Sequence, residues 1–281
     1  MKKIKICYTD AQNLGDAINP LIVSRVLGYE PELSNVWNCE MTGIGSGLRR
    51  FFISEKDCSK KALLKRKVMN AINKKTVIIW SAGFLSTPNK GMVPLRNHFK
   101  VASVRGTLSK QWIEEITQKP LKGCTVGDAG ILASELIPQN TEKKYKLGII
   151  PHRSEKTLSS VEELKNKVRD SIVIDIEPDN PLECLTQIAG CECILSSSLH
   201  GLIFADSFRI PNKHIILSDN LSGDGFKFND YYSAFSLMDD PIDMRNIKDV
   251  NISDITSSYC ISDEQVTKLK EDCKNAFYMY L

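Results

Sequence analysis

The stretch Glu192–Asn212, ECILSSSLHGLIFADSFRIPN, decides the fold because it holds a strand, a serine-rich turn and a helix in direct succession. Cys193–Leu195 is the apolar run of a buried strand. Three serines and His200 follow, and then comes an apolar helical pattern that Pro211 ends. A strand that runs directly into a helix is typical of a parallel α/β sheet with crossover helices.

The turn of this stretch predicts an anion site. The backbone N–H groups and positive dipole at the start of a helix attract phosphate or carboxylate, so Ser197, Ser198 and Leu199 are candidate binding residues. His200 adds a side chain that can give or take a proton near neutral pH. The plainer alternative is that the serines only cap the helix and that His200 packs against its own turn.

The rest of the chain alternates between strand and helix patterns, which predicts parallel sheets with crossover helices. A polar and aromatic loop is predicted over Gly223–Phe235. The predicted strands are Lys3–Tyr8, Val36–Met41, Thr76–Trp80, Lys100–Val104, Cys124–Val126, Tyr145–Ile150, Ser171–Ile176 and Lys213–Leu217; the predicted helices are Ala17–Leu27, Ser59–Ile72, Thr107–Ile116, Val161–Val168, Leu182–Ala189 and Ser262–Tyr280.

The polar, proline-containing segment Pro138–Lys144 is the predicted linker between two domains, residues 1–138 and residues 145–281. We expect two Rossmann-like, doubly wound α/β domains that face each other across a cleft. The terminal helix is assigned to the second domain. In open α/β sheets ligands bind beyond the carboxyl ends of the strands, and the polar turns of this chain follow its predicted strands.

Composition narrows the function. A net charge of +3 is too small to indicate nucleic-acid binding. The nine cysteines form no CxxC pair and no zinc spacing, and the opening MKKIKICY is typical of a strand rather than a signal peptide. No apolar run is long enough to span a bilayer. These features predict a reduced, soluble, cytoplasmic protein without a metal site.

Positive charge is concentrated between Arg49 and Lys75, where only Glu55 and Asp57 oppose it. A solvated helix face is the commoner explanation. The alternative is that the basic helix 59–75 contacts anionic lipid headgroups or gathers acidic substrates.

Two glycine-containing turns follow strands near the amino terminus. In the first, Asn13 and Asp16 flank Gly15 at a predicted helix start, where they either cap the helix or line a site. The second, Gly43–Gly47 (GIGSG), lacks the full GxGxxG spacing of a dinucleotide loop. Its glycines more readily turn the chain or admit a ligand close to the backbone.

Basic side chains follow two further strands. Arg105 stands at a strand end, where a guanidinium needs an anion or a carboxylate, and Gly83 lies in the turn after the strand Thr76–Trp80. His152 and Arg153 follow Tyr145–Ile150 in the same way. We therefore expect Arg105 and Arg153 to hold an anion.

The chain resembles the polysaccharide pyruvyl transferase family over nearly its whole length. The motifs that carry the resemblance are NLGDAINP, GIGSG, WSAGF, SVRGTLS, VGDAG, IIPHRSE, SSSLHGLIFADSFRIPN and FKFNDYYSAF. The family is similar in fold to two-domain glycosyltransferases of the B type. Its members are implied to move the enolpyruvyl group of phosphoenolpyruvate onto a sugar, which forms a cyclic pyruvate ketal in a surface polysaccharide or its lipid-linked precursor.

One motif departs from the family pattern. Many relatives have arginine where this chain has Ser198, so the resemblance implies that other cations hold the donor here. Arg105 and Arg153 are the candidates, with Lys227 behind them.

The implied chemistry needs an acid/base group and cations. It assigns the acid/base role to His200, with His152 assisting, and the role of base toward the sugar to Asp16. No organic cofactor is required, because phosphoenolpyruvate is a co-substrate. The other implied substrate-binding residues are Asn13, Gly15, Gly83, Ser197, Ser198 and Leu199.

Two alternatives remain open. A glycosyltransferase of the same architecture would need a carboxylate for the ribose of a nucleotide sugar, which Glu177 could supply. A non-catalytic glycan- or anion-binding protein would fit the missing arginine.

Overall fold

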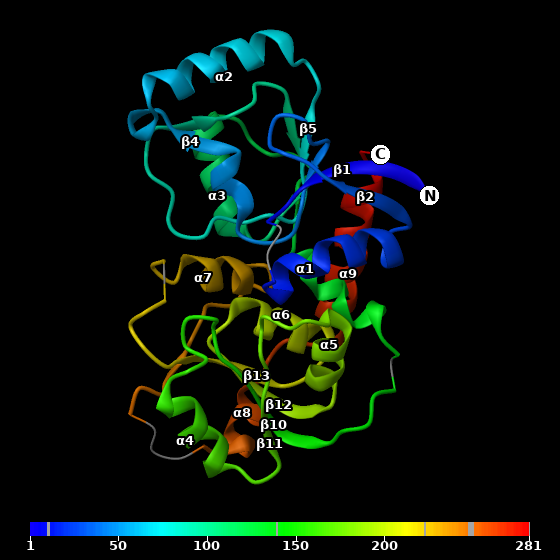
Figure 1. Ribbon diagram of the computed structural model, residues 1–281, viewed down its shortest axis with the longest axis vertical. Helices are drawn as coiled ribbons and strands as arrows, with labels where there is room; N and C mark the ends of the chain where they lie inside the picture. The colour runs from blue at the N-terminus through cyan, green and yellow to red at the C-terminus, as the bar shows by residue number, and fades with distance from the viewer. Residues whose placement is uncertain (10–11, 139, 222, 247–249, 281) are drawn as a thin grey trace.

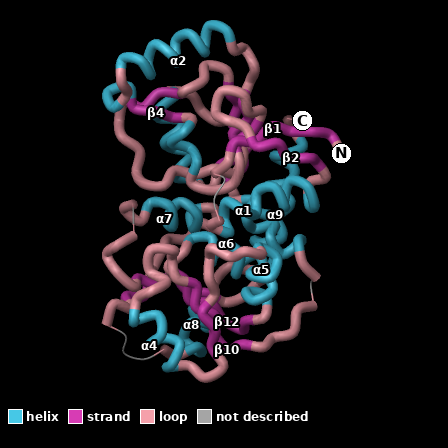
Figure 2. The backbone as a smooth tube through the Cα atoms, viewed as in Figure 1, coloured by secondary structure: helices cyan, strands magenta, loops and turns pink. Residues whose placement is uncertain are grey.

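The computed structural model describes residues 1–9, 12–138, 140–221, 223–246 and 250–280. Residues 10–11 of the turn before Asp16 and residue 139 of the predicted linker lie outside the described part. Two α/β halves lie one above the other along the long axis, and helices α1, α6 and α7 lie between them (Figure 1). In Figure 2 the strands accordingly form two groups with these helices between.

The N-terminal half is built on a parallel sheet in the order β2-β1-β3-β5-β7. Its strands are β1 (Lys2–Cys7), β2 (Tyr29–Leu33), β3 (Met41–Thr42), β5 (Val77–Ile79) and β7 (Phe99–Val101), with the smaller pairs β4 (Phe52–Ser54) with β6 (Met92–Pro94) and β8 (Ser103–Val104) with β9 (Thr125–Val126). Its helices are α1 (Leu14–Leu21), which continues into the π-helical turn Ile22–Val26, α2 (Lys60–Ile72), α3 (Thr107–Thr117) and the 3₁₀ helix η4 (Ala129–Leu136).

The C-terminal half repeats this plan with a parallel sheet in the order β11-β10-β12-β13-β14. Its strands are β10 (Tyr145–Ile150), β11 (Ser171–Val173), β12 (Cys191–Ser196), β13 (Asn212–Ile216) and β14 (Ile242–Asp243). The helices of this part of the chain are α4 (Ser159–Lys167), α5 (Pro181–Ala189), α6 (Leu199–Ser207), α7 (Phe226–Ser233), α8 (Ile252–Ser258) and α9 (Asp263–Tyr278).

Both sheets place their first strand between the second and the third, so each has a topological switch point beside that strand. Ligands of doubly wound folds bind in the crevice at the carboxyl ends of the strands at such a point. The switch points lie at the ends of β1 and β3 in one half and of β10 and β12 in the other. The prediction of two Rossmann-like parallel sheets is confirmed; the exact domain boundaries and the likeness to B-type glycosyltransferases stay predictions.

Two predicted elements were wrong. The predicted strand Val36–Met41 is mostly a turn, where the Asn35 side chain accepts N–H bonds from Trp37 and Asn38 at 2.9 and 3.2 Å. The edge strand is instead β2, a polar segment that contains Pro31 and is tolerated because an edge strand leaves one side of its ladder open.

The predicted loop Gly223–Phe235 contains helix α7. Gly225 precedes the helix with φ 78°, a left-handed conformation that suits glycine, and Asp224 accepts a hydrogen bond from the Phe226 N–H at 3.2 Å. Phe228 and Tyr231 are buried at helical spacing. The aromatic side chains therefore form a packed helix face between the two halves.

The terminal helix α9 runs beside the N-terminal half (Figure 1). The Trp80 indole donates a hydrogen bond to the Cys273 carbonyl at 3.0 Å, and Phe277 packs edge-on against Tyr29 at 5.3 Å between ring centroids. The end of the chain thus closes onto the first sheet. None of the described helices combines the length and hydropathy that crossing a bilayer requires.

Candidate active site

A cavity of about 290 Å³ lies where the two switch points meet. Its lining residues follow strands of both sheets: Thr9, Asn13 and Asp16 come after β1, Ser46 after β3, Leu85 after β5, His152 and Arg153 after β10, and Ser198, Leu199 and His200 after β12, with Lys227 from α7. Eight of the residues predicted from the sequence therefore meet in one place: Asn13, Asp16, His152, Arg153, Ser198, Leu199, His200 and Lys227.

His200 lies in the first turn of α6 and is only partly exposed. A Cβ added to Gly15 would overlap its imidazole, so the glycine is what admits the ring. The Nε2 atom of His200 is buried and has no hydrogen-bond partner within the described residues. Burial, and then the charges of Arg105 and Lys227, lower the pKa of His200 to about 3. Without a ligand the ring is therefore neutral, with one nitrogen unused.

Asp16 lies in the first turn of α1, on the side of the cavity formed by the N-terminal half. Burial raises its pKa to about 6, against the opposing effects of a Thr9 hydrogen bond and of Arg50 and Arg153. Asp16 Oδ1 and His200 Cε1 each lie 3.9 Å from the position of a Cβ on Gly45, so the two side chains approach the same point. A carboxyl with this pKa can exchange a proton near neutral pH.

Two cations at the cavity, Lys227 and Arg153, are held in no ion pair by the residues that the structure describes. Within the described residues, neither Lys227 nor Arg153 makes a hydrogen bond or ion pair; Lys227 Nζ lies 5.0 Å from the ring centroid of Phe228. Lys227 is buried and Arg153 is exposed. Burial and the nearby Arg105 lower the pKa of Lys227 to about 8. Unpaired cations in a cavity are suited to an anionic ligand.

The serine turn differs from its prediction. The N–H of Ser197 donates to the Ile150 carbonyl at 3.2 Å, and the N–H of Ser198 donates to Ser196 Oγ at 3.0 Å. These two amides are thus committed to the turn itself rather than free for an anion. No side chain caps α6, so its first-turn amides, beginning with Leu199, remain the available donors.

His152 is held beside this turn. The backbone N–H of His152 donates to Ser197 Oγ at 2.9 Å, and the ring atom Nδ1 lies 2.8 Å from Ser154 Oγ. Burial, followed by the charges of Lys227 and Arg153, lowers its pKa to about 4. The imidazole is therefore neutral and available as a hydrogen-bonding group.

Arg105 does not line the cavity. Its side chain is fully buried and pairs with Asp230 of α7, with Nη2 2.9 Å from Oδ2, while Nη1 donates to Ser46 Oγ at 3.0 Å. Gly83 lies against the guanidinium, because a Cβ there would overlap it. The expected direct contact of Arg105 with an anion is not available in this arrangement. Arg105 acts on the cavity through Ser46 and through its charge.

The sequence reasoning missed four residues at the site. Thr9, Ser46 and Leu85 line the cavity, and Arg50 donates to the Tyr8 carbonyl at 3.1 Å and to Thr9 Oγ1 at 3.0 Å. The available signal for Arg50 was its place three residues after the glycine-rich turn Gly43–Gly47.

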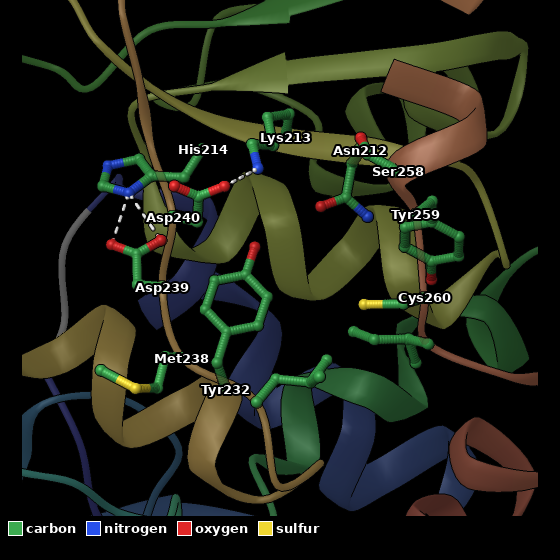
Figure 3. A pocket seen from close by; sticks show the side chains of 12 residues that line it. Asn212, Lys213, His214, Tyr232, Met238, Asp239, Asp240, Ser258, Tyr259 and Cys260 are labelled. Carbon is green, nitrogen blue, oxygen red and sulfur yellow. Dashed lines mark hydrogen bonds and ion pairs between the residues drawn. The ribbon is translucent and has the colours of Figure 1, made fainter. Parts of the chain in front are cut away.

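A different cavity, of about 190 Å³, lies beside β13 (Figure 3). His214 Nδ1 lies 2.8 Å from Asp239, and Lys213 Nζ lies 2.9 Å from Asp240. Lys213 is already paired with a carboxylate and His214 already has a hydrogen-bond partner, so this cavity is a weaker candidate for an anion. Within the described residues, no three His, Cys, Asp or Glu side chains gather as metal ligands would.

The fold and the site define a two-sheet α/β protein with a cationic cavity between its sheets. The polysaccharide pyruvyl transferase family matches residues 38–218, and the chain belongs to that family.

Individual relatives match parts of the chain. An uncharacterized protein of Acanthamoeba polyphaga mimivirus is 34% identical over 138 residues, which are 48% of this chain and 47% of that protein. The succinoglycan biosynthesis protein ExoV of Rhizobium meliloti is 26% identical over 162 residues, 51% of this chain and 49% of ExoV. The matches thus span about half the length of these curated relatives. A crystal structure of an uncharacterized Klebsiella pneumoniae protein superposes with a TM-score of 0.45 at 14% identity, covering 82% of this chain and 87% of that one.

Proposed function

We propose that the protein transfers the pyruvyl group of phosphoenolpyruvate to a pair of sugar hydroxyls, forming a pyruvate ketal on a surface polysaccharide or its lipid-linked precursor. The observation that carries the proposal is the convergence, in a chain of this family, of an unpartnered imidazole nitrogen with two unpaired cations. These groups share one cavity at the switch points of both sheets.

The donor is bound through its charges. Lys227 and Arg153 attract the phosphate and the carboxylate, and the uncapped amino end of α6 supplies N–H donors. Ser198, where many relatives have arginine, contributes no charge. Lys227 is positioned to replace it, because it lines the same cavity and forms no ion pair within the described residues.

His200 becomes an acid when the donor is bound. In the empty cavity the charges of Arg105 and Lys227 oppose its protonation. A multiply charged phosphoenolpyruvate offsets both cations and raises the pKa of His200, since an opposite charge nearby favours the protonated ring. The imidazolium then gives its proton to the methylene carbon, which makes C2 electrophilic.

Asp16 takes the proton of the first sugar hydroxyl as that oxygen attacks C2. The C2–phosphate bond breaks, and a second hydroxyl attacks C2 to close the ketal. The proton of the second hydroxyl leaves with the phosphate. The proton delivered to the methyl group is balanced by the one that Asp16 accepts, so the net products are ketal and inorganic phosphate.

The acceptor has room beside the donor. A further cavity, of about 400 Å³, shares Leu85 and Lys227 with the first. Phe228 and Ile216 supply apolar surface there, and Asn229 and Ser218 supply hydrogen-bonding groups. An apolar wall with a few polar groups suits a sugar ring, which has apolar faces and a polar edge.

The test is release of inorganic phosphate from phosphoenolpyruvate in the presence of glycan acceptors, with mass spectrometry of the glycan. The expected result is phosphate release that depends on the acceptor, together with a pyruvyl ketal on the glycan. Turnover of a nucleotide sugar without use of phosphoenolpyruvate would replace this proposal with a glycosyltransferase.

A further inference from the structure

Helix α2 turns an apolar stripe toward solvent. Leu64 is 63% exposed, Val68 50% and Ile72 70%. Side chains four residues apart are neighbours on a helix surface, so the three form one continuous stripe. The helix lies at the outer end of the N-terminal half, away from the second sheet (Figure 1).

The opposite face of α2 holds the helix to the protein with polar groups. Asn70 Nδ2 donates to the Leu95 carbonyl at 2.9 Å, and Arg66 Nη2 donates to the Pro94 carbonyl at 2.9 Å. An ordinary surface helix buries its apolar face and exposes its polar one. The apolar stripe of α2 therefore has no function in the core.

Lysines border the stripe on both sides. At 3.6 residues per turn, Lys60 and Lys67 fall on one side of it and Lys65 on the other, and Lys61 lies at its amino-terminal end. All four are exposed, and within the described residues none of them forms an ion pair. Their charge is uncompensated, so the face is cationic at its edges and apolar along its middle.

We propose that α2 is an interfacial helix that docks the protein on an anionic membrane. The apolar stripe enters the boundary between headgroups and acyl chains, and the lysine stems lie along it while their ammonium groups meet lipid phosphates. A second copy of this helix would bring lysines against lysines, and an acidic polymer would leave the stripe in water. A bilayer of anionic lipid matches both parts of the surface.

Docking by α2 does not depend on the proposed reaction, so either proposal can be disproved while the other stands. Binding is measured by co-sedimentation of the whole chain with vesicles of phosphatidylcholine alone and of equal parts phosphatidylcholine and phosphatidylglycerol. We expect binding to the anionic vesicles only, weakened by salt because the lysine contribution is screened.

Two variants separate the apolar and the charged contributions. Replacement of Leu64, Val68 and Ile72 by Ser is expected to lower the partition coefficient about tenfold or more, since the stripe supplies the buried area. Replacement of Lys60, Lys61, Lys65 and Lys67 by Gln is expected to lower it at least about tenfold, since each lysine near an anionic surface contributes.

Matched controls lie elsewhere on the surface. Replacement of Leu33, Met238 and Met279 by Ser removes other exposed apolar side chains, and replacement of Lys119 and Lys122 by Gln removes other exposed charges. Both controls are expected to bind like the wild type. Unchanged vesicle binding in the α2 serine variant, or a loss of self-association rather than of vesicle binding, would overturn the proposal. Unchanged melting temperatures would exclude unfolding as the cause.

Discussion

Gly15 lies directly against the imidazole of His200, so close that a Cβ at position 15 would overlap Nδ1, Cγ and Cε1 of the ring. The contact joins the first turn of α1 to the first turn of α6, which belong to different halves of the molecule. The orientation of the proposed acid therefore depends on the absence of a side chain on the facing helix.

The substitution Gly15→Ala should displace His200 and lower kcat about a hundredfold, because a misplacement of about one ångström has effects of that size. The matched control is Gly47→Ala, where an added Cβ meets no atom within 4 Å. Steady-state kinetics with circular dichroism checks the prediction. Normal turnover in folded Gly15→Ala enzyme would show that the ring position does not matter.

The buried pair Arg105–Asp230 should matter for stability. Both side chains are 0% exposed, and removing one partner leaves an uncompensated buried charge, so Asp230→Asn should lower the free energy of unfolding by about 3 to 5 kcal/mol. Urea denaturation measures this loss.

The exposed side chain of Arg153 should matter for donor binding and not for stability. Arg153→Gln should leave the urea midpoint unchanged and weaken phosphoenolpyruvate binding, because this side chain has no partner within the described residues and lines the cavity. A different outcome is possible for Asp230→Asn, in which the free energy of unfolding is unchanged and phosphoenolpyruvate binds weakly. That outcome would show that Arg105 contacts the donor directly.

Much of the fold could be predicted because alternating apolar and helical patterns report burial directly. Tyr145–Ile150 has the same bounds in the structure as in the prediction. The strand prediction for Val36–Met41 failed because the observed strand β3 is only Met41–Thr42, which is too short for a sequence pattern to define. Helix α7 was not predicted because its aromatic residues pack between the two halves of the molecule. That packing is a property of tertiary structure rather than of local sequence.

Some features of the candidate site could also be predicted from the local sequence, and others depend on the folded structure. Strand-end residues such as His152 and His200 could be predicted to meet, since the carboxyl ends of parallel strands share one edge. The buried ion pair of Arg105 could not be predicted, because its partner Asp230 lies 125 residues further on, in helix α7, which the sequence pattern did not predict. The hydrogen bonds that occupy the Ser197 and Ser198 amides likewise depend on the folded turn.

Donor affinity should fall in alkali. The pKa of Lys227 is lowered to about 8, so as pH rises through that value the amine loses its proton and its attraction for the anion. Titration calorimetry with phosphoenolpyruvate from neutral to alkaline pH should show this decline. Lys227→Met should bind about tenfold or more weakly at neutral pH and lack the decline, while Lys227→Arg should keep affinity in alkali.

Asp16 should set the acid limb of the rate profile. Its pKa is raised from 3.8 to about 6, so below about pH 6 it is protonated and cannot accept the hydroxyl proton. kcat/KM should fall as pH falls through this value, and Asp16→Asn should lose turnover. Because the raised pKa means that folding disfavours the ionised carboxyl, Asp16→Asn should also be more stable than the wild type at neutral pH. That advantage should vanish as pH falls below the unfolded value. A wild-type profile that is flat through pH 6 would remove Asp16 from the mechanism.

The most direct test of the proposed role of His200 compares turnover and donor binding in His200→Asn, which retains a polar side chain without the proton-transfer function. We expect titration calorimetry still to show phosphoenolpyruvate bound with near wild-type affinity, while acceptor-dependent release of phosphate falls by about two orders of magnitude or more. Undiminished phosphate release and ketal formation by His200→Asn would contradict that role.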